Sequence, residues 1–294
     1  MQTDKPLVSV CVITYNHQDY IVQALDGILR QKTDFPFEII LSDDCSTDKT
    51  PDICNEYASR FPLIIRYTRR ERNVGIFRNF FETLKEARGE YVAICEGDDY
   101  WTDDYKLKKQ VSILEEKPEC VLTYHNAIVA DGKEKKLFIN LNNGCRKVGI
   151  QSLLWQWLIP TASIMYRNDA FFLPEDCPAF INGDYLLELL LKTKGDFYYD
   201  CSIMSVYRYH EGSASEQLNR NRLSLYKGLV DLLTYCKRLY PQEQQKYFDS
   251  PIAKYNKEIA GIEKHLRYPF LKYLDWRHYK RMLFKALRIK RENP

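Results

Sequence analysis

The chain has 294 residues, of which 45% are hydrophobic and 28% are charged, with a net charge of +3. This composition is typical of a globular protein, and the 14% of aromatic residues argues against a disordered chain. No apolar run approaches the roughly 18 residues that a membrane-spanning helix needs. The N-terminus does not resemble a signal peptide. We therefore expect a cytoplasmic globular protein.

The N-terminal part of the chain alternates predicted strands and helices. Short apolar, β-branched runs indicate buried strands, and apolar residues at helical spacing indicate helices with one buried side. This order favours an α/β fold with a mostly parallel sheet covered by helices. The predicted strands are 8–16, 37–44, 63–68 and 91–99. The predicted helices are 17–31, a segment with Thr50 as its N-cap and Pro51 in its first turn, and 77–87.

The second half has a mixed pattern and ends in helices. From about residue 216 the spacing is helical, with expected interruptions at Pro241, Pro251 and Pro269. The expected elements before that point are a helix at 102–116 and strands at 120–129, 161–166 and 197–207.

The cysteines point to a reducing compartment. Nine are present and no two form a CxxC motif, so the sequence supports neither a zinc site nor a thioredoxin-type site. Several lie within apolar segments, where a thiol acts as a small hydrophobic group. We expect free thiols rather than a disulfide framework.

Acidic side chains follow two of the predicted strands, at the point where each strand ends. Asp43 and Asp44 end the second strand, and Glu96, Asp98 and Asp99 end the fourth. Ligands of such sheets bind beyond the carboxyl ends of the strands. Clustered carboxylates repel one another unless a cation or a hydrogen-bond donor joins them. A divalent metal that also binds substrate phosphates would remove this repulsion. Alternatively, these acids only end the strands and cap the turns that follow.

Five segments resemble the inverting glycosyltransferases of family 2. They are TYN at 14–16, EIILSDDCSTDKT at 38–50, ERNVGIFRN at 71–79, GEYVAICEGDDYW at 89–101 and YRYHEGSAS at 207–215. The resemblance implies a GT-A type fold, with a Rossmann-like, mostly parallel central sheet flanked by helices. It also implies that residues 1–215 are the catalytic domain and that 216–294 are a helical C-terminal extension with a basic tail.

The resemblance implies a UDP-sugar as the donor. Asp43 matches the acid that accepts a hydrogen bond from N3–H of uracil, and Asp44 is expected to orient the loop beside it. Arg78 matches a basic residue near the diphosphate, where a guanidinium suits paired oxygen atoms. The residues expected to bind the donor are Thr14, Tyr15, Asn16, Asp43, Asp44, Arg78, Glu96 and Asp98.

The same resemblance implies a divalent metal, Mn²⁺ or Mg²⁺. Glu96 and Asp98 fall where the family has its Asp-x-Asp motif, and Asp98 is the expected ligand. Glu96 departs from the usual aspartate, and its longer side chain is expected to reach the ribose or a metal-bound water. His210 matches a family histidine that binds the same metal, and imidazole suits Mn²⁺ better than Mg²⁺.

The reaction also needs a base that removes the proton of the acceptor hydroxyl. In the family an aspartate near a helix start does this, often after a glutamate. Asp184 in FINGDYLLELLL matches, with Gly183 in place of the glutamate. Asp184 is alternatively the N-cap of that helix, a role that does not exclude the first. Glu188, one turn later, is the reserve candidate.

The implied activity is inverting transfer of a sugar to a hydroxyl of a glycan or lipid-linked acceptor, in bacterial surface polysaccharide biosynthesis. A nucleotidyltransferase is disfavoured, because TYNHQDY lacks a glycine-rich phosphate loop. A catalytically inactive nucleotide-sugar-binding module stays an alternative, because Glu96 and Gly183 depart from the family. Nucleic acid is not an expected partner.

The C-terminal residues are strongly basic. Residues 264–294 contain ten Lys or Arg residues but only Asp275 and Glu292 as acids. Trp276, Tyr279 and other apolar residues recur at helical spacing between the basic ones, which is typical of a helix that lies on an anionic membrane. We expect 270–294 either to contact the inner face of the cell membrane or to pack on the catalytic domain.

Overall fold

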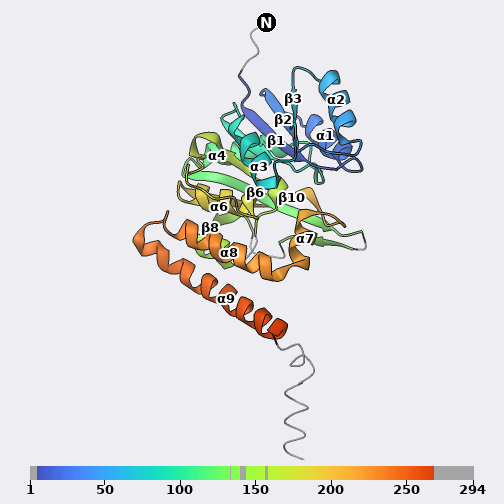
Figure 1. Cartoon of the computed structure of the whole chain (residues 1–294). Coiled ribbons are helices and arrows are strands. Elements are labelled where there is room, and N and C mark those ends of the chain that lie inside the picture. Colours follow the sequence, from blue (N-terminus) through green and yellow to red (C-terminus); the bar gives the residue numbers. More distant parts are fainter. Residues whose placement is uncertain (1–4, 133, 140–143, 156–157, 268–294) are drawn as a thin grey trace, which may run out of the picture.

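The computed structural model describes residues 5–132, 134–139, 144–155 and 158–267 (Figure 1). The basic tail and Pro269 therefore lie outside the described residues. The strands are β1 (Val8–Thr14), β2 (Phe37–Asp43), β3 (Ile65–Arg69), β4 (Tyr91–Ile94), β5 (Tyr100–Trp101), β6 (Cys120–Ala130), β7 (Lys135–Leu137), β8 (Arg146–Val148), β9 (Met165–Arg167) and β10 (Asp196–Arg208). The helices are α1 (Ile21–Leu29), α2 (Thr50–Arg60), α3 (Ile76–Lys85), α4 (Lys106–Glu116), α5 (Ile150–Trp155), α6 (Gly183–Lys192), α7 (Ala214–Arg220), α8 (Arg222–Lys237) and α9 (Gln242–Arg267), with 3-10 turns η1 (Thr161–Ser163) and η2 (Asn168–Ala170).

The described strands form one sheet, whose main path has the order β3-β2-β1-β4-β9-β6-β10-β5. Off this path, β7 pairs with β6 and β8 pairs with β10. The pairs from β3 to β4 are all parallel. Strand β9 is antiparallel to both β4 and β6, and β6 then pairs with β10 in parallel. The expected α/β architecture with a central sheet flanked by helices is confirmed, and its regular parallel part is the N-terminal half.

Alternation along the strands divides the core into two layers. In β1, Val10 and Val12 belong to one hydrophobic cluster, and Cys11 and Ile13 belong to the other, because successive side chains point to opposite faces of a sheet. Helices α1, α2 and α4 contribute to the first cluster, whereas α3, α6 and α8 contribute to the second. Helix α9 packs beside α8 at the outside of that second layer (Figure 1).

Three local expectations were wrong. The strand expected at 161–166 begins only at Met165, because 161–163 form the turn η1. Pro251 lies inside α9 and does not end it. Its missing N–H costs helix stability, but Ile252 and Tyr255 pack on the core and offset that loss. Thr50 is the first residue of α2, and its backbone N–H donates to Asp48 Oδ1 at 2.8 Å.

Among the described residues, no helix combines the length and the apolar character that crossing a membrane requires.

Candidate functional site

A cavity of about 570 Å³ opens at the carboxyl ends of β1 and β4. The loop before α3, the start of α6 and the segment after β10 complete its wall. Ligand sites lie at this edge of parallel sheets because the strand ends and helix starts converge there. The predicted site residues that line it are Thr14, Tyr15, Asp44, Glu96, Asp98 and Asp184.

Three predicted donor-binding residues lie outside the described lining. The fully buried Asp43 carboxylate accepts hydrogen bonds from Ser46 N–H at 3.0 Å and from the Tyr67 hydroxyl at 3.3 Å. Asn16 holds the same loop, because its Oδ1 accepts from Thr47 N–H at 2.8 Å. Arg78 is exposed and its Nε donates to Glu82 at 2.6 Å.

Asp44 connects the end of β2 to the start of α3. Its Oδ1 accepts from Val74 N–H at 2.8 Å, and its Oδ2 accepts from Gly75 N–H at 3.0 Å. Gly75 has a φ of 87°, which only glycine adopts without strain. Both carboxylate oxygens of Asp44 therefore hold the loop that leads into α3.

Asp98 lies between two histidines. Its Oδ2 is 3.2 Å from Nε2 of His210 and 3.8 Å from Nε2 of His17. Burial acts to raise the pKa of Asp98, but the hydrogen bond from His210 and the charge of both imidazoles outweigh it and lower that pKa. The same hydrogen bond raises the pKa of His210. Sequence analysis missed His17, because a lone histidine directly after TYN has no distinguishing pattern.

Two further carboxyl groups, those of Glu96 and Asp99, lie close to Asp98. Burial and the charge of Asp98 raise the pKa values of Glu96 and Asp99 well above their usual range. Oδ1 of Asp99 accepts from Arg208 N–H at 2.8 Å, but its buried Oδ2 has no partner among the described residues. Clustered carboxylates of this kind, next to an imidazole, fit a divalent cation.

Asp184 also lines the cavity, at the start of α6. The N-cap position belongs to Asn182, so the alternative that Asp184 is the N-cap was wrong. Asp184 Oδ2 accepts from the Thr161 hydroxyl at 3.3 Å, and its Oδ1 accepts from Tyr185 N–H at 2.8 Å. Burial raises the pKa of Asp184, and these two hydrogen bonds oppose the rise. A carboxylate with a raised pKa is a stronger base once it is ionised.

Two residues of the quoted segments are part of the core, namely Glu188 in FINGDYLLELLL and Trp101 at the end of GEYVAICEGDDYW. Glu188 is 1% exposed, and burial, together with the charge of Asp184, raises its pKa well above the usual range. Because Glu188 is buried and does not line the cavity, it is less suited than Asp184 to act as the base. Trp101 is fully buried, and its indole N–H donates to the Ala162 carbonyl at 2.8 Å.

The cavity also has apolar walls that the sequence analysis did not anticipate. Ile76 and Phe77 come from α3, and Leu218 and Leu225 come from α7 and α8. The last two residues lie beyond the expected domain boundary at 215. The helical spacing of apolar residues in this region predicts helices with one buried side. It does not predict that Leu218 and Leu225 face this cavity.

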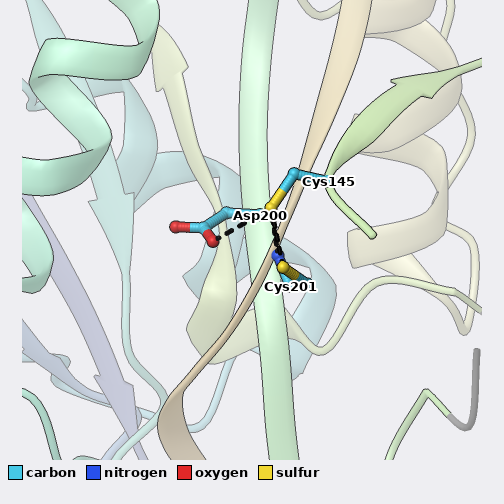
Figure 2. Close-up of side chains that lie close together, drawn as sticks. All are labelled: Cys145, Asp200 and Cys201. Carbon is cyan, nitrogen blue, oxygen red and sulfur yellow. Dashed lines mark hydrogen bonds between the residues drawn. The ribbon is translucent and has the colours of Figure 1, made fainter. Parts of the chain in front are cut away.

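A second group of potential metal ligands lies away from this cavity (Figure 2). The Sγ atoms of Cys145 and Cys201 are 2.7 Å apart, and Cys145 Sγ is 3.8 Å from Asp200 Oδ1. Both cysteines are exposed free thiols beside the antiparallel pair β8–β10. Sequence analysis missed the group because its two cysteines are 56 residues apart.

The chain matches a family model and several known proteins. The family model described as Glycosyl transferase family 2 matches residues 9–173. The uncharacterized protein Rv1520 of Mycobacterium tuberculosis is 41% identical over 206 residues, which are 69% of this chain and 59% of that protein. The putative teichuronic acid biosynthesis glycosyltransferase TuaG of Bacillus subtilis is 35% identical over 139 residues, 46% of this chain and 53% of TuaG. The chain thus spans less than two thirds of the length of these relatives.

Solved structures show the same fold. Residues 1–349 of TarS from S. aureus, in complex with UDP, superpose with a TM-score of 0.62 at 21% identity, covering 90% of this chain and 73% of that one. The mannosyltransferase PcManGT from Pyrobaculum calidifontis, in complex with GDP-Man and Mn²⁺, gives a TM-score of 0.58 at 18% identity, covering 92% and 83%.

Proposed function

Since the chain belongs to glycosyl transferase family 2, we propose that it is an inverting, metal-dependent enzyme. It transfers a sugar from a UDP-sugar to a hydroxyl of a glycan or lipid-linked acceptor. The observation that carries this proposal is a single cavity whose lining includes both Asp98, which contacts His210, and Asp184. Such a cavity can hold a diphosphate at one end and an acceptor hydroxyl near a base at the other.

The donor end is the part of the cavity around Asp98. Asp98 and His210 would hold a Mn²⁺ or Mg²⁺ ion, with Glu96 close by. When bound, the ion supplies positive charge that stabilises the leaving diphosphate. Solved complexes of TarS with UDP and with UDP-GlcNAc support a uridine nucleotide, and the Mn²⁺ in the PcManGT structure supports a divalent metal. Thr14, Tyr15 and the loop held by Asp44 would enclose the nucleotide.

The acceptor end is the part around Asp184. Asp184 would take the proton of the acceptor hydroxyl as that oxygen attacks the anomeric carbon from the side opposite the diphosphate, which inverts the configuration. Thr161 and the Tyr185 backbone orient the carboxylate through their hydrogen bonds. The proton then rests on Asp184, whose raised pKa favours that state.

The printed functions of the relatives support a cell-surface polysaccharide as the product. TuaG is named for teichuronic acid biosynthesis, and TarS is named a poly(ribitol-phosphate) β-N-acetylglucosaminyltransferase. We place the reaction in the cytoplasm. The basic residues 270–294, which lie outside the described residues, would contact the inner face of the membrane if the acceptor is lipid-linked. Salt-sensitive binding to anionic liposomes that is lost on deletion of 270–294 would support this contact.

We assign catalysis to residues 1–215 and regard 216–294 as a helical extension. Leu218 and Leu225 line the cavity, so the extension also shapes the site. The proposal is tested by incubating the full chain with a panel of UDP-sugars and Mn²⁺ and measuring UDP release. Release with one or a few donors is the expected result. UDP binding without turnover of any donor, with or without cell-wall acceptors, would instead favour the inactive binding module.

A further inference from the structure

Asn182 occupies the N-cap position of α6 but does not cap the helix. An asparagine at this position ordinarily accepts a hydrogen bond from a backbone N–H of the first turn. The structure has no such bond at Asn182. By contrast, Asn221 at the start of α8 accepts from Ser224 N–H at 3.2 Å, and Ser213 at the start of α7 accepts from Glu216 N–H at 3.3 Å.

The side-chain oxygen of Asn182 is buried and unpaired. Asn182 is 3% exposed, and its Oδ1 has no hydrogen-bond partner among the described residues. Aromatic rings cover the next residue, because a Cβ on Gly183 would lie 3.4 Å from Phe81 and 3.6 Å from Phe80. A buried acceptor without a donor costs free energy, which a ligand can recover by supplying the donor.

The cavity identifies that ligand. Asn182 lines it two residues before Asp184, whereas Ile181, just before it, is 43% exposed and marks the outer edge. In the proposed mechanism the transferred sugar lies close to Asp184, because the hydroxyl that Asp184 deprotonates attacks the anomeric carbon of that sugar. A sugar is rich in hydroxyl donors, and the acceptor must enter from the open side.

We infer that Asn182 Oδ1 accepts a hydrogen bond from a hydroxyl of the transferred sugar and so takes part in selecting the donor. This inference rests on the UDP-sugar donor proposed above. A site that hydrogen-bonds a substrate hydroxyl discriminates strongly against analogues in which that hydroxyl is missing or misplaced. Asn182 would therefore act on the sugar part of the donor and leave binding of the nucleotide unchanged.

The test compares Asn182→Ala with the wild type by calorimetric titration in Mn²⁺. The ligands are UDP, UDP-glucose, UDP-galactose, UDP-GlcNAc and UDP-GalNAc. We expect Asn182→Ala to bind UDP as the wild type does, and to bind the preferred UDP-sugar roughly two- to tenfold more weakly. Its melting temperature should not fall, because the amide oxygen has no partner to lose.

Asn221→Ala is the matched control. It should lower the melting temperature, since it removes a capping bond, and leave all five affinities unchanged. If Asn182→Ala loses affinity for UDP and for the UDP-sugar equally, or loses neither, the inference about Asn182 is wrong but the proposed UDP-sugar donor is not. The same holds if its melting temperature is lowered as much as in Asn221→Ala. A wild type that binds no UDP would overturn the proposed donor and this inference with it.

Discussion

Nε2 of His210 lies 3.2 Å from Oδ2 of Asp98, although 112 residues separate the two in the chain. The contact joins the segment after β10 to the turn after β4, two ends that the sheet order separates by β9 and β6. It places an imidazole on the carboxylate that the sequence identifies as the metal ligand. The metal and base assignments follow from this arrangement and can be tested separately.

Asp98→Ala should abolish both metal binding and transfer. The variant removes the carboxylate that contacts both His17 and His210, so its Mn²⁺ affinity, measured by calorimetry, should fall below detection. Far-UV circular dichroism should show an intact fold. Asp34→Ala, which removes an exposed carboxylate paired with Lys108, is the control and should bind Mn²⁺ normally. Full activity of Asp98→Ala in EDTA would refute the assignment.

Asp184→Asn should slow transfer without weakening the binding of UDP. The amide keeps the size of the side chain but cannot take a proton, so kcat should fall by at least roughly 100-fold. Glu188→Gln is the matched control. Because Glu188 is buried in the core and does not line the cavity, its amide variant should have nearly the wild-type kcat. If instead Glu188→Gln is inactive and Asp184→Asn is active, the base is Glu188.

The acid side of the pH–rate profile should depend on Thr161. The base works only when ionised, and burial raises the pKa of Asp184, so kcat should be lost as pH falls through a pKa above the ordinary value of about 4. The Thr161 hydroxyl stabilises the ionised form. Thr161→Val should therefore move this loss to higher pH. Thr161 also lowers the pKa of Glu96. The shift should therefore persist in a Glu96→Gln background. If the shift disappears there, the group that titrates is Glu96 and not Asp184.

The resemblance assigns recognition of uracil to Asp43, which is fully buried and lies outside the described lining of the cavity. If the nucleobase reaches this carboxylate, the enzyme should prefer UDP to CDP. N3 of uracil carries a hydrogen that a carboxylate accepts, whereas N3 of cytosine is itself an acceptor, a difference worth about 1–3 kcal/mol. Asp43→Asn should remove most of the preference in fluorescence titrations with the two nucleotides. Ser46→Ala, which removes one hydrogen bond to Asp43, should lower stability and keep the preference. Equal affinity of the wild type for UDP and CDP would contradict the prediction.

Lys106 should make the stability of the fold depend on pH. It is fully buried over the Trp101 ring, donates to Gln110, and has a pKa that burial lowers to about 7. Between about pH 7 and about pH 10 the unfolded chain binds more protons, so the free energy of unfolding should rise by up to about 1.4 kcal/mol per pH unit. Urea unfolding should show a smaller rise in Lys106→Met and an unchanged rise in Lys108→Met, which alters an exposed lysine. Equal slopes in all three proteins would show that Lys106 is charged in the fold.

The sequence by itself determined the α/β class, β1, β2 and β4, and the acids at two strand ends. Each of these depends on a local pattern. Runs of β-branched residues predict buried strands, and apolar residues at helical spacing predict the helices that cover the sheet. The carboxyl ends of parallel strands lie at one edge of the sheet. The roles predicted for Asp98 and Asp184 came instead from the resemblance to family 2 glycosyltransferases, whose motifs are short segments next to a strand or a helix.

Only the tertiary structure decided which side chains meet. His17 lies next to Asp98, Asn182 lines the cavity with its buried amide oxygen unpaired among the described residues, and Arg78 pairs with Glu82 instead of lining the cavity. An asparagine at the start of a helix is expected to accept a hydrogen bond from a backbone N–H of the first turn. No local pattern in the sequence indicates that Asn182 lacks this bond. These partners come from segments far apart in the chain, and their choice depends on packing across the sheet, whereas periodicity describes only one segment at a time.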